Sequence, residues 1–363
     1  MPIKKISISN FRCFDHIELE FSELNNFIHG ANGSGKTSIL EALYFCSTGR
    51  SFKSSNKNLC IKNNKEAFKI KLETLQNNKI CILKELKKSI SFVVDENKAT
   101  SIELFRALPS TLLDNKIFSM FADTPKFRRK ILDRCLMASD KEYSKDFFSF
   151  HRSLKQRNAA LKFKKLTNIE SWSEIFIKSG TFISEKRSNF FEETKKTFFG
   201  FAEYLSDERL LNIIDSLDVV FYKGWKEETS LKNALESNKE LDQRKSTTTS
   251  GPHRADIKFL IKDSDIKYIL SRGEQKFMSI LWCFSMHKTL TESYGVEPFL
   301  IIDDIHSELD EDFYNELLNF IPKTGNQLFF SDINNPFNSK IMDQPKELKK
   351  FHVEQFTNAK KTK

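Results

Sequence analysis

The feature that most constrains this 363-residue chain is one loop near its N-terminus, Gly30-Ala31-Asn32-Gly33-Ser34-Gly35-Lys36-Thr37. The loop fits the pattern G-x-x-x-x-G-K-[ST] in full, and it stands between a short apolar strand and an apolar helix. In that context, backbone N–H groups and the helix N-terminus point at nucleotide phosphates, so all eight residues are expected to bind ATP. Lys36 should reach the β- and γ-phosphates as a catalytic residue, and the Thr37 hydroxyl should ligate Mg²⁺.

A pair of aspartates follows a buried strand late in the chain. The apolar run Phe299-Leu-Ile-Ile302 ends in Asp303 and Asp304. An acidic residue at the end of a buried strand beside a P-loop binds Mg²⁺ through water, so we expect Asp303 to share the metal with Thr37. Asp304 would then orient or deprotonate the attacking water as the second catalytic residue. A helix cap is the alternative interpretation of the two aspartates.

Two further motifs flank the aspartate pair in sequence, one before Asp303 and one after Asp304. The segment Leu270-Ser271-Arg272-Gly273-Glu274 resembles the signature motif of ABC-type ATPases, and Ser307-Glu-Leu-Asp310 resembles their D-loop. In that superfamily, the residues at Ser271 and Gly273 face the γ-phosphate bound by the opposite subunit, and the D-loop with Asp310 runs between the two nucleotides. Ser271 and Glu274 also fit an ordinary helix capping box, and both interpretations can be true.

The hydrophobic pattern divides the chain into three parts. Apolar residues alternate with period two in residues 1–100 and again after residue 256, which indicates strands. No proline occurs between Pro125 and Pro252, and apolar spacings of three and four indicate helices over 126–245. We therefore predict an α/β fold, an ABC/SMC-like P-loop ATPase head with a mixed sheet. Residues 1–107 and 250–363 would form this head, split by a mainly helical lobe over 108–249.

Charge indicates an acidic partner. The net charge is +9, which favours nucleic acid or a membrane surface, although a lysine-rich solubilising surface would also explain it. The N-terminus lacks the apolar core of a signal peptide, and no apolar run approaches the roughly 18 residues of a membrane span. The six scattered cysteines lack zinc-site spacing and suggest reduced thiols. We expect a cytoplasmic protein with no membrane partner.

Candidate DNA contacts come from two basic segments. One segment carries six positive charges in 14 residues with no acid among them, which suits phosphates but equally a solvated helix face. Its basic residues are Arg152, Lys155, Arg157, Lys162, Lys164 and Lys165. The other segment follows the P-loop helix, where Arg50 and Lys53 could reach DNA or a partner subunit.

Beyond these motifs, the sequence resembles the RecF family along essentially its whole length. The resemblance rests on Ser9-Asn-Phe-Arg12-Cys-Phe14, Pro125-x-x-Arg128-Arg129-x-x-Leu132-Asp133, Leu154-Lys-Gln-Arg157-Asn158-Ala-Ala-Leu161, Gly251-Pro-His-Arg-Ala-Asp256 and Phe351-His-Val-Glu354. As in that family, Asp304 stands where ABC proteins usually have glutamate, and Ser331 stands where transporters have a histidine. Arg12 is expected to approach the nucleotide. We identify no Q-loop glutamine in residues 108–116.

The resemblance implies an ATPase head that dimerises around two ATP molecules and binds DNA as a dimer. It implies weak, DNA-stimulated ATP hydrolysis that resets the dimer, and action with RecR and RecO at junctions of single- and double-stranded DNA. There the family helps to load RecA in recombinational repair and replication-fork maintenance. Two other classes stay open: a short-armed SMC-like chromosome-structure ATPase, and a P-loop hydrolase or kinase of a small substrate.

Overall fold

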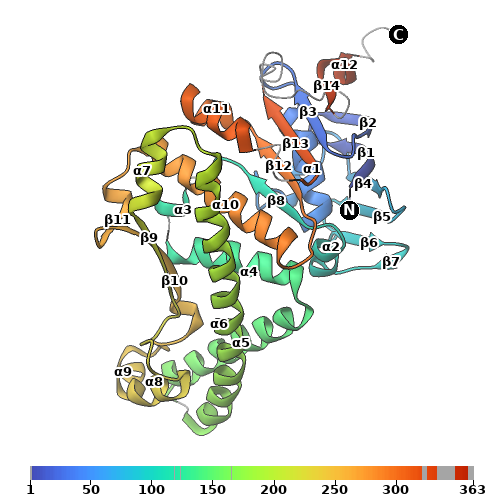
Figure 1. Ribbon diagram of the computed structural model, residues 1–363. Coiled ribbons are helices and arrows are strands. Elements are labelled where there is room, and N and C mark those ends of the chain that lie inside the picture. Colours follow the sequence, from blue (N-terminus) through green and yellow to red (C-terminus); the bar gives the residue numbers. More distant parts are fainter. Residues whose placement is uncertain are drawn as a thin grey trace. The chain divides into compact units, whose positions relative to one another are not determined.

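The computed structural model describes residues 2–117, 119–122, 124–164, 166–320, 325–332 and 348–358. Two compact units make up the chain: a head unit of Met1–Phe118 with Lys276–Lys363, and an inserted unit of Ser119–Gln275. The expected boundaries at 107/108 and 249/250 differ from these. Strand β8 (Ser110–Leu113) joins a sheet of the head unit, and β10 (Asp256–Ile261) pairs inside the inserted unit. Figure 1 shows the elements of both units.

One sheet of the head unit is antiparallel, with the strand order β2-β1-β4-β5-β6-β7. Alternate side chains turn into the core, and Ile6, Ile8 and Ile70 are fully buried. The period-two pattern of the sequence is thus confirmed for this sheet. Its strands are β1 (Ile3–Phe11), β2 (Phe14–Glu20), β4 (Ala67–Thr74), β5 (Lys79–Glu85), β6 (Ser91–Val94) and β7 (Asn97–Lys98).

The other sheet of the head unit is parallel, with the strand order β14-β3-β13-β12-β8. All four of its strand pairs run parallel, so strands of both orientations occur in the head but in two separate sheets. Every residue of β12 is buried, as the continuous apolar run predicts for a parallel strand covered on both faces. The remaining strands are β3 (Asn25–His29), β12 (Phe299–Asp303), β13 (Leu328–Asp332) and β14 (Leu348–His352).

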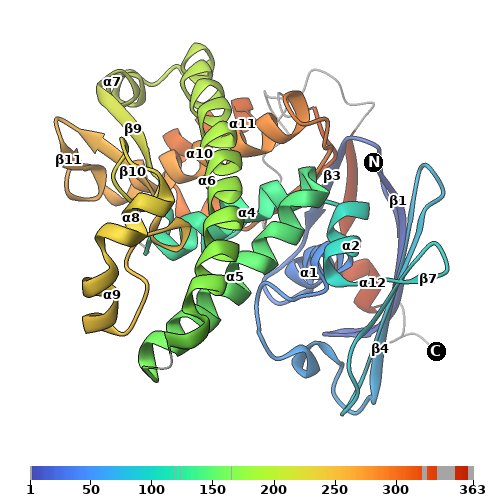
Figure 2. The ribbon, with the colours of Figure 1, turned by 90° about the horizontal axis from the view of Figure 1, so that it is seen from below.

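Helix α1 (Lys36–Thr48) packs between the two sheets of the head unit. It contacts β1, β4 and β5 of the antiparallel sheet and β8, β12 and β13 of the parallel sheet. Figure 2 shows α1 from below, next to the antiparallel sheet that contains β1 and β4. Ile39, Leu40 and Leu43 are fully buried there, so the position of the helix N-terminus is fixed by packing. The other head helices are α2 (Ser101–Ala107), most of α10 (Arg272–Glu292), α11 (Glu311–Phe320) and α12 (Glu354–Asn358).

The inserted unit is mainly helical but also contains a three-stranded antiparallel sheet, β11-β10-β9. Helices α5 and α6 pack along each other (Figures 1 and 2). Strand β9 lies inside the segment predicted as helical. Its period-two pattern, with Leu217 and Val219 buried, is too short to stand out beside the long helical pattern that surrounds it. The elements are α3 (Ser119–Ala122), α4 (Pro125–Ser139), α5 (Lys141–Lys162), α6 (Ile169–Gly200), α7 (Glu208–Ser216), β9 (Leu217–Tyr222), α8 (Leu231–Ser237), α9 (Lys239–Lys245), β10 and β11 (Ser264–Asp265).

Two of the family motifs in the inserted unit, 125–133 and 251–256, bind each other. Arg128 Nε and Nη2 donate to the two carboxylate oxygens of Asp256 at 2.7 and 3.0 Å. Its neighbour Arg129 donates to the carbonyl oxygen of Ala255. A bidentate arginine–carboxylate pair fixes distance and orientation together, so these bonds fasten α4 to the start of β10.

A buried ion pair joins the same turn to α6. Arg187 Nε and Nη2 donate to the Asp133 carboxylate at 2.7 and 2.9 Å, and Nη1 donates to the carbonyl oxygen of Pro252 at 2.7 Å. The Tyr143 hydroxyl donates to the same carboxylate. The Arg187 side chain is only 2% exposed. This fully bonded charge pair therefore links α4, α5, α6 and the Gly251–Asp256 turn.

The turn itself explains why the motif needs Gly251 and His253. Gly251 has φ 137°, and a Cβ atom there would lie 2.6 Å from the Phe176 ring. His253 Nε2 lies 3.0 Å from the carbonyl oxygen of Thr248, while its buried Nδ1 has no hydrogen-bond partner among the residues that the structure describes. Burial lowers the pKa of His253 to about 4, so the neutral ring donates through Nε2. His253 thus has a structural place in the turn.

Removing one partner of the Arg187–Asp133 pair should strongly destabilise the inserted unit. We expect Arg187→Ala to lower the free energy of unfolding by about 3–5 kcal/mol, because it leaves the Asp133 carboxylate buried without its countercharge. The matched control is Lys186→Ala, which removes the half-exposed Lys186–Asp140 pair and should cost about 1 kcal/mol or less. Urea unfolding followed by circular dichroism measures both. Equal losses for the two variants would contradict this account.

Candidate nucleotide-binding site

The P-loop connects the end of β3 to the start of α1 in the head unit. Gly35 has φ 116°, and a Cβ atom at this position would lie 2.7 Å from the Phe14 ring and 2.8 Å from Cys13 Sγ. Glycine is therefore required both by the left-handed backbone and by the close approach of the β1–β2 turn. The first turn of α1 has no acidic residue, so its N–H groups and positive dipole end suit a phosphate.

The side chain of Lys36, the first residue of α1, folds back over the P-loop. Its ammonium donates to the carbonyl oxygens of Gly30 at 2.7 Å and Ala31 at 3.2 Å, and the residue is 7% exposed. These bonds keep the charge over the loop that would receive the phosphates. A phosphate oxygen can replace a carbonyl oxygen as the acceptor, so Lys36 is placed for the predicted role.

The two predicted metal ligands meet across 266 residues of sequence. The Thr37 hydroxyl donates to Asp303 Oδ1 at 3.0 Å. Ser331, at the end of β13, donates its hydroxyl to the same oxygen at 2.8 Å and accepts the N–H of Asp304 at 3.3 Å. Burial raises the pKa of Asp303, and the hydrogen bonds from Ser331 and Thr37 oppose that rise. From the sequence, Ser331 is only the residue that stands where transporters have a histidine. In the structure its hydroxyl bonds the side chain of Asp303 and the backbone of Asp304, and so positions both aspartates.

Asp304 follows β12 in a left-handed backbone conformation, with φ 51° and ψ 44°. Burial, and then the negative charge of Asp332, raises the pKa of Asp304. A carboxylate with a raised pKa is a better proton acceptor than one in water, which suits the predicted role in activating a water molecule. The Lys36 ammonium opposes the rise, so the two predicted catalytic residues are coupled electrostatically.

Arg12 lies in an ion pair beside the loop. Its Nε and Nη2 donate to the two carboxylate oxygens of Glu41 at 2.7 and 2.6 Å, and Glu41 is fully buried in α1. Its third nitrogen, Nη1, donates to the carbonyl oxygen of Leu59 at 2.8 Å. Arg12 also lines a hollow of about 400 Å³ with Cys13, Leu59, Ile61, Lys62 and Asn63. A nucleotide contact by Arg12 stays a prediction. In the structure, the Arg12 guanidinium is bound to the Glu41 carboxylate.

Glu354 is a site residue that sequence reasoning missed. Its Oε1 accepts the backbone N–H of Ala31, the second residue of the P-loop, at 3.0 Å. Strand β14 pairs with β3 up to His352, opposite His29, and the Val353 N–H then bonds the carbonyl oxygen of His29. Glu354 is therefore carried to the loop by strand pairing. Glu354 belongs to the family motif Phe351–Glu354, but no pattern in the sequence connects it to Ala31.

The predicted trans-acting residues occupy the ends of helices. The Ser271 N–H donates to Glu274 Oε2 at 2.7 Å, and the Glu274 N–H donates to Ser271 Oγ at 3.3 Å, so the capping box is present. Asp310 Oδ1 accepts the N–H of Phe313 at 2.9 Å and caps α11. In the head unit, Lys276 of α10 donates to both the carbonyl and the carboxylate of Glu308 at 2.8 Å. This bond ties α10 to the D-loop segment.

The candidate DNA contacts separate into different environments. Arg152 and Lys155 are exposed on α5, and Arg50 is exposed beyond the C-terminus of α1. Lys53 is also exposed, and its charge acts on the nucleotide site, where it opposes the rise in the pKa of Asp303. Lys165 and the basic C-terminal tail, 360–363, lie outside the described residues.

Arg157 requires a correction, because it faces the interior. It is 4% exposed, and its Nη1 donates to Asp242 Oδ2 at 2.8 Å and to Thr248 Oγ1 at 2.6 Å. Its neighbour Asn158 accepts the N–H of Thr248 at 2.8 Å. A guanidinium committed to a buried carboxylate is not available to a phosphate, so Arg157 supports the fold of the inserted unit instead of contacting DNA.

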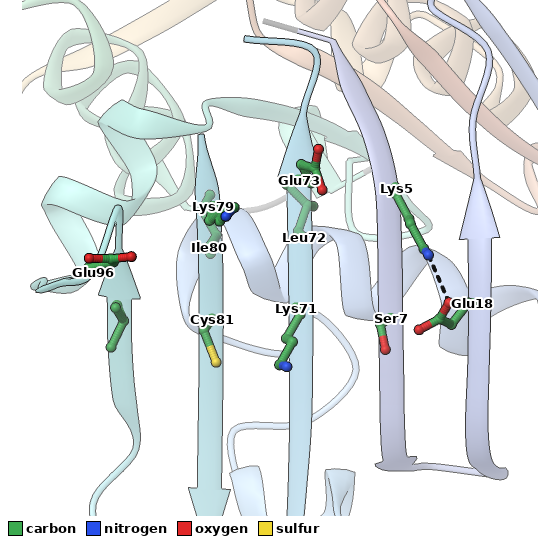
Figure 3. Close-up of a pocket in the computed structure, with 11 residues that line it drawn as sticks. Lys5, Ser7, Glu18, Lys71, Leu72, Glu73, Lys79, Ile80, Cys81 and Glu96 are labelled. Carbon is green, nitrogen blue, oxygen red and sulfur yellow. Dashed lines mark ion pairs between the residues drawn. The ribbon is translucent and has the colours of Figure 1, made fainter. Parts of the chain in front are cut away.

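The larger hollow of the head unit lies elsewhere. It has a volume of about 470 Å³ and lies on the antiparallel sheet, where Lys5, Ser7, Glu18 and Lys71 line it from neighbouring strands (Figure 3). Lys5 and Glu18 form an ion pair at 2.8 Å within it. Its lining of paired charges matches an ordinary solvated sheet face, and none of its lining residues belongs to the P-loop.

The described residues offer neither a cage for a metal ion nor a membrane-spanning helix. In the described part of the chain, no three acidic, histidine or cysteine side chains are grouped as a metal cage. Mg²⁺ beside a nucleotide takes most of its ligands from phosphate and water, so Thr37 and Asp303 fit that ion without such a cage. Of the helices that the structure describes, none has the length and apolar character needed to traverse a bilayer.

The fold and this site together define a P-loop ATPase head. The family model described as "RecF/RecN/SMC N terminal domain" matches residues 2–356. The DNA replication and repair protein RecF of Pseudoalteromonas translucida (strain TAC 125) is 32% identical over 361 residues, which cover 97% of this chain and 98% of that protein. RecF of Vibrio vulnificus (strain CMCP6) is 31% identical, with 98% of each chain covered. The chain belongs to the RecF family.

Solved structures agree with this assignment. A structure of the recombination mediator protein RecF with ATP, described as part of the RecFOR pathway, has a TM-score of 0.80 at 26% identity and covers 97% of this chain and 96% of its own. The same protein with ATPrS gives 0.79 at 27% identity, with 97% of each chain covered. An Smc head bound to a domain of ScpA gives 0.55 at 15% identity over 92% of this chain and 90% of its own, a likeness of fold alone.

The bond between Glu354 and the P-loop should contribute to nucleotide affinity. We expect Glu354→Ala to weaken ATP binding about fivefold, which corresponds to about 1 kcal/mol for a charge-assisted bond to a carboxylate that is 40% exposed. Glu354→Gln keeps an acceptor oxygen and should lose less. Glu18→Ala removes a comparably exposed, ion-paired carboxylate from the antiparallel sheet and serves as the control. Isothermal titration with ATP measures all three, and an unchanged affinity for Glu354→Ala would refute the contribution.

Proposed function

We propose that this chain is an ATP-dependent DNA-binding clamp that binds ATP with Mg²⁺ and dimerises at junctions of single- and double-stranded DNA. The observation that carries the proposal is the 3.0 Å bond between Thr37 and Asp303 beside the P-loop. A hydroxyl and a carboxylate brought together at that point are the two protein ligands that P-loop ATPases give to Mg²⁺. The solved RecF relatives that share this fold are described with ATP or ATPrS.

Each residue of the site has a definite task in this proposal. The N–H groups of the first turn of α1 and of the loop, apart from that of Ala31, bind the phosphates, and Lys36 exchanges its carbonyl partners for phosphate oxygens. Thr37 and Asp303 bind the metal, which when present neutralises charge on the β- and γ-phosphates. Asp304 orients the attacking water and accepts its proton, while Ser331 orients both aspartates. Hydrolysis is weak, is stimulated by DNA and resets the clamp.

The clamp forms when two copies share their nucleotides. Ser271 is exposed at the N-terminus of α10, a 21-residue helix, and Gly273 lies in its first turn. A hydroxyl beside a helix N-terminus is a suitable donor set for the γ-phosphate of a second copy. Within the head unit, the bond between Lys276 and Glu308 fastens α10 to the segment that ends in Asp310. The ATP would lie between two subunits.

The biological setting follows from the relatives. Those proteins are named DNA replication and repair proteins, and the solved ones are described as recombination mediators in the RecFOR pathway. We propose that this chain acts in recombinational repair and replication-fork maintenance in the cytoplasm. Its partners would be RecR and RecO, and together they would help to load RecA on single-stranded DNA next to a duplex.

The proposal predicts that ATP increases the retention of DNA. Fluorescence anisotropy with a labelled gapped duplex should show at least tenfold tighter binding with ATP and Mg²⁺ than without nucleotide. Lys36→Ala should abolish this difference, because it removes the cation that binds the β- and γ-phosphates, while binding without nucleotide stays unchanged.

Two results would refute the clamp. If ATP altered neither the DNA affinity nor the preference for gapped over fully paired DNA, a hydrolase or kinase of a small substrate would be the better assignment. If ATP tightened binding equally to gapped and fully paired DNA, a short-armed SMC-like chromosome-structure ATPase would be favoured.

A further inference from the structure

One face of α5 combines exposed positive charge with exposed aromatic rings. Phe148, Arg152, Lys155 and Lys162 follow the spacing i, i+4, i+7 and i+14, which puts them on one side of the helix, and Phe163 follows its last residue. All five are exposed. We call these five residues the α5 stripe. At 1.5 Å per residue, its helical part is about 21 Å long.

The two phenylalanines of the stripe are unusual in this protein. The chain contains 35 phenylalanines, and among the described residues only Phe148, 53% exposed, and Phe163, 67% exposed, count as exposed. The others are buried or half-buried, as expected of so apolar a side chain. Two exposed rings, one on α5 and one directly after its last residue, indicate a surface that a partner covers.

Two cations of the stripe face aromatic rings instead of carboxylates. In the described part of the chain, neither Arg152, Lys155 nor Lys162 has a carboxylate within 4.0 Å. Arg152 lies 6.0 Å from the Trp172 ring and Lys162 lies 5.9 Å from the Phe163 ring. No aspartate or glutamate occurs between residues 147 and 169. Arg157 faces inward, pairs with Asp242 and does not neutralise the stripe.

We infer that the α5 stripe binds single-stranded nucleic acid, an inference that rests on the proposed DNA-binding function and deepens it. The charge of the stripe selects a polyanion, and the rings select unpaired bases. Aromatic side chains stack on bases that are free of their own stack, whereas a duplex offers mainly its phosphates to an exposed helix face. The combination of cations and exposed rings on one helix face therefore fits a single strand better than a duplex.

Two double variants separate the contribution of the rings from that of the charges. Phe148→Ala with Phe163→Ala should weaken the binding of a labelled oligothymidylate about tenfold or more and leave its salt dependence unchanged. Arg152→Ala with Lys155→Ala should reduce the slope of log affinity against log salt by about 1.4, the value for two lost phosphate contacts on a single strand. Phe148→Tyr with Phe163→Tyr keeps both rings and should bind like the wild type.

The control is Lys232→Ala with Lys239→Ala, which removes two exposed charges from α8 and α9 and should change neither affinity nor slope. A blunt duplex of equal length and an acidic peptide are titrated in parallel. The inference is overturned if the wild type does not bind the oligonucleotide, or if the double phenylalanine variant binds it normally. It is also overturned if that variant loses duplex binding to the same degree, or loses only the acidic peptide.

The experiments on the α5 stripe and those on the proposed clamp function can fail independently of each other. ATP-dependent retention of gapped DNA by the wild type tests the clamp and does not require the stripe. The contrast between variants on the oligonucleotide tests the stripe and does not require ATP. A protein that binds through the stripe but ignores ATP would leave this inference standing and refute the proposed function.

Discussion

The hydrogen bond between Thr37 and Asp303 is the point on which the nucleotide site depends. It joins the first turn of α1 to the end of β12, two elements separated by the whole inserted unit in sequence. The bond can form because β3, which leads into the P-loop, and β12 lie in one parallel sheet with β13 between them. Ser331, the last residue but one of that middle strand, bonds the same carboxylate. Carboxyl ends of parallel strands meet at one edge of a sheet, and this is where the site lies.

The inserted unit is stabilised by four arginines, of which Arg128, Arg129 and Arg157 belong to its family motifs. Arg128, Arg129 and Arg187 converge on the Gly251–Asp256 turn, and Arg157 pairs with Asp242. Each charge is matched by a carboxylate or carbonyl, which offsets the cost of burying it. Arginine motifs of the inserted unit could be taken for ligand-binding residues from the sequence alone, but in the structure they bind one another and support the fold. The cations left on the surface of α5 stand out because the buried ones are already paired.

Much of the head unit and its site could be predicted from sequence, because each feature is encoded by neighbouring residues. The P-loop, the buried strand before Asp303 and the capping box at Ser271 are all local patterns. The remainder depends on pairing between distant segments. Ser331 reaches Asp303 through the alignment of β13 with β12, and Glu354 reaches Ala31 through the alignment of β14 with β3. The sequence predicts a DNA contact for Arg157 because it lies in a run of basic residues. Which face of that helix is buried depends on the segments that pack against it, and these are distant in sequence.

The central claim is that the P-loop is half of a site completed by the signature helix of a second copy. Sedimentation velocity of the 42.4 kDa chain with and without ATP and Mg²⁺ tests it most directly. The account predicts a species of twice the chain mass with ATP only, and it predicts that Ser271→Arg binds ATP yet stays at the single-chain mass. A wild-type protein that keeps one chain mass when saturated with ATP, or a Ser271→Arg variant that still dimerises, would contradict it.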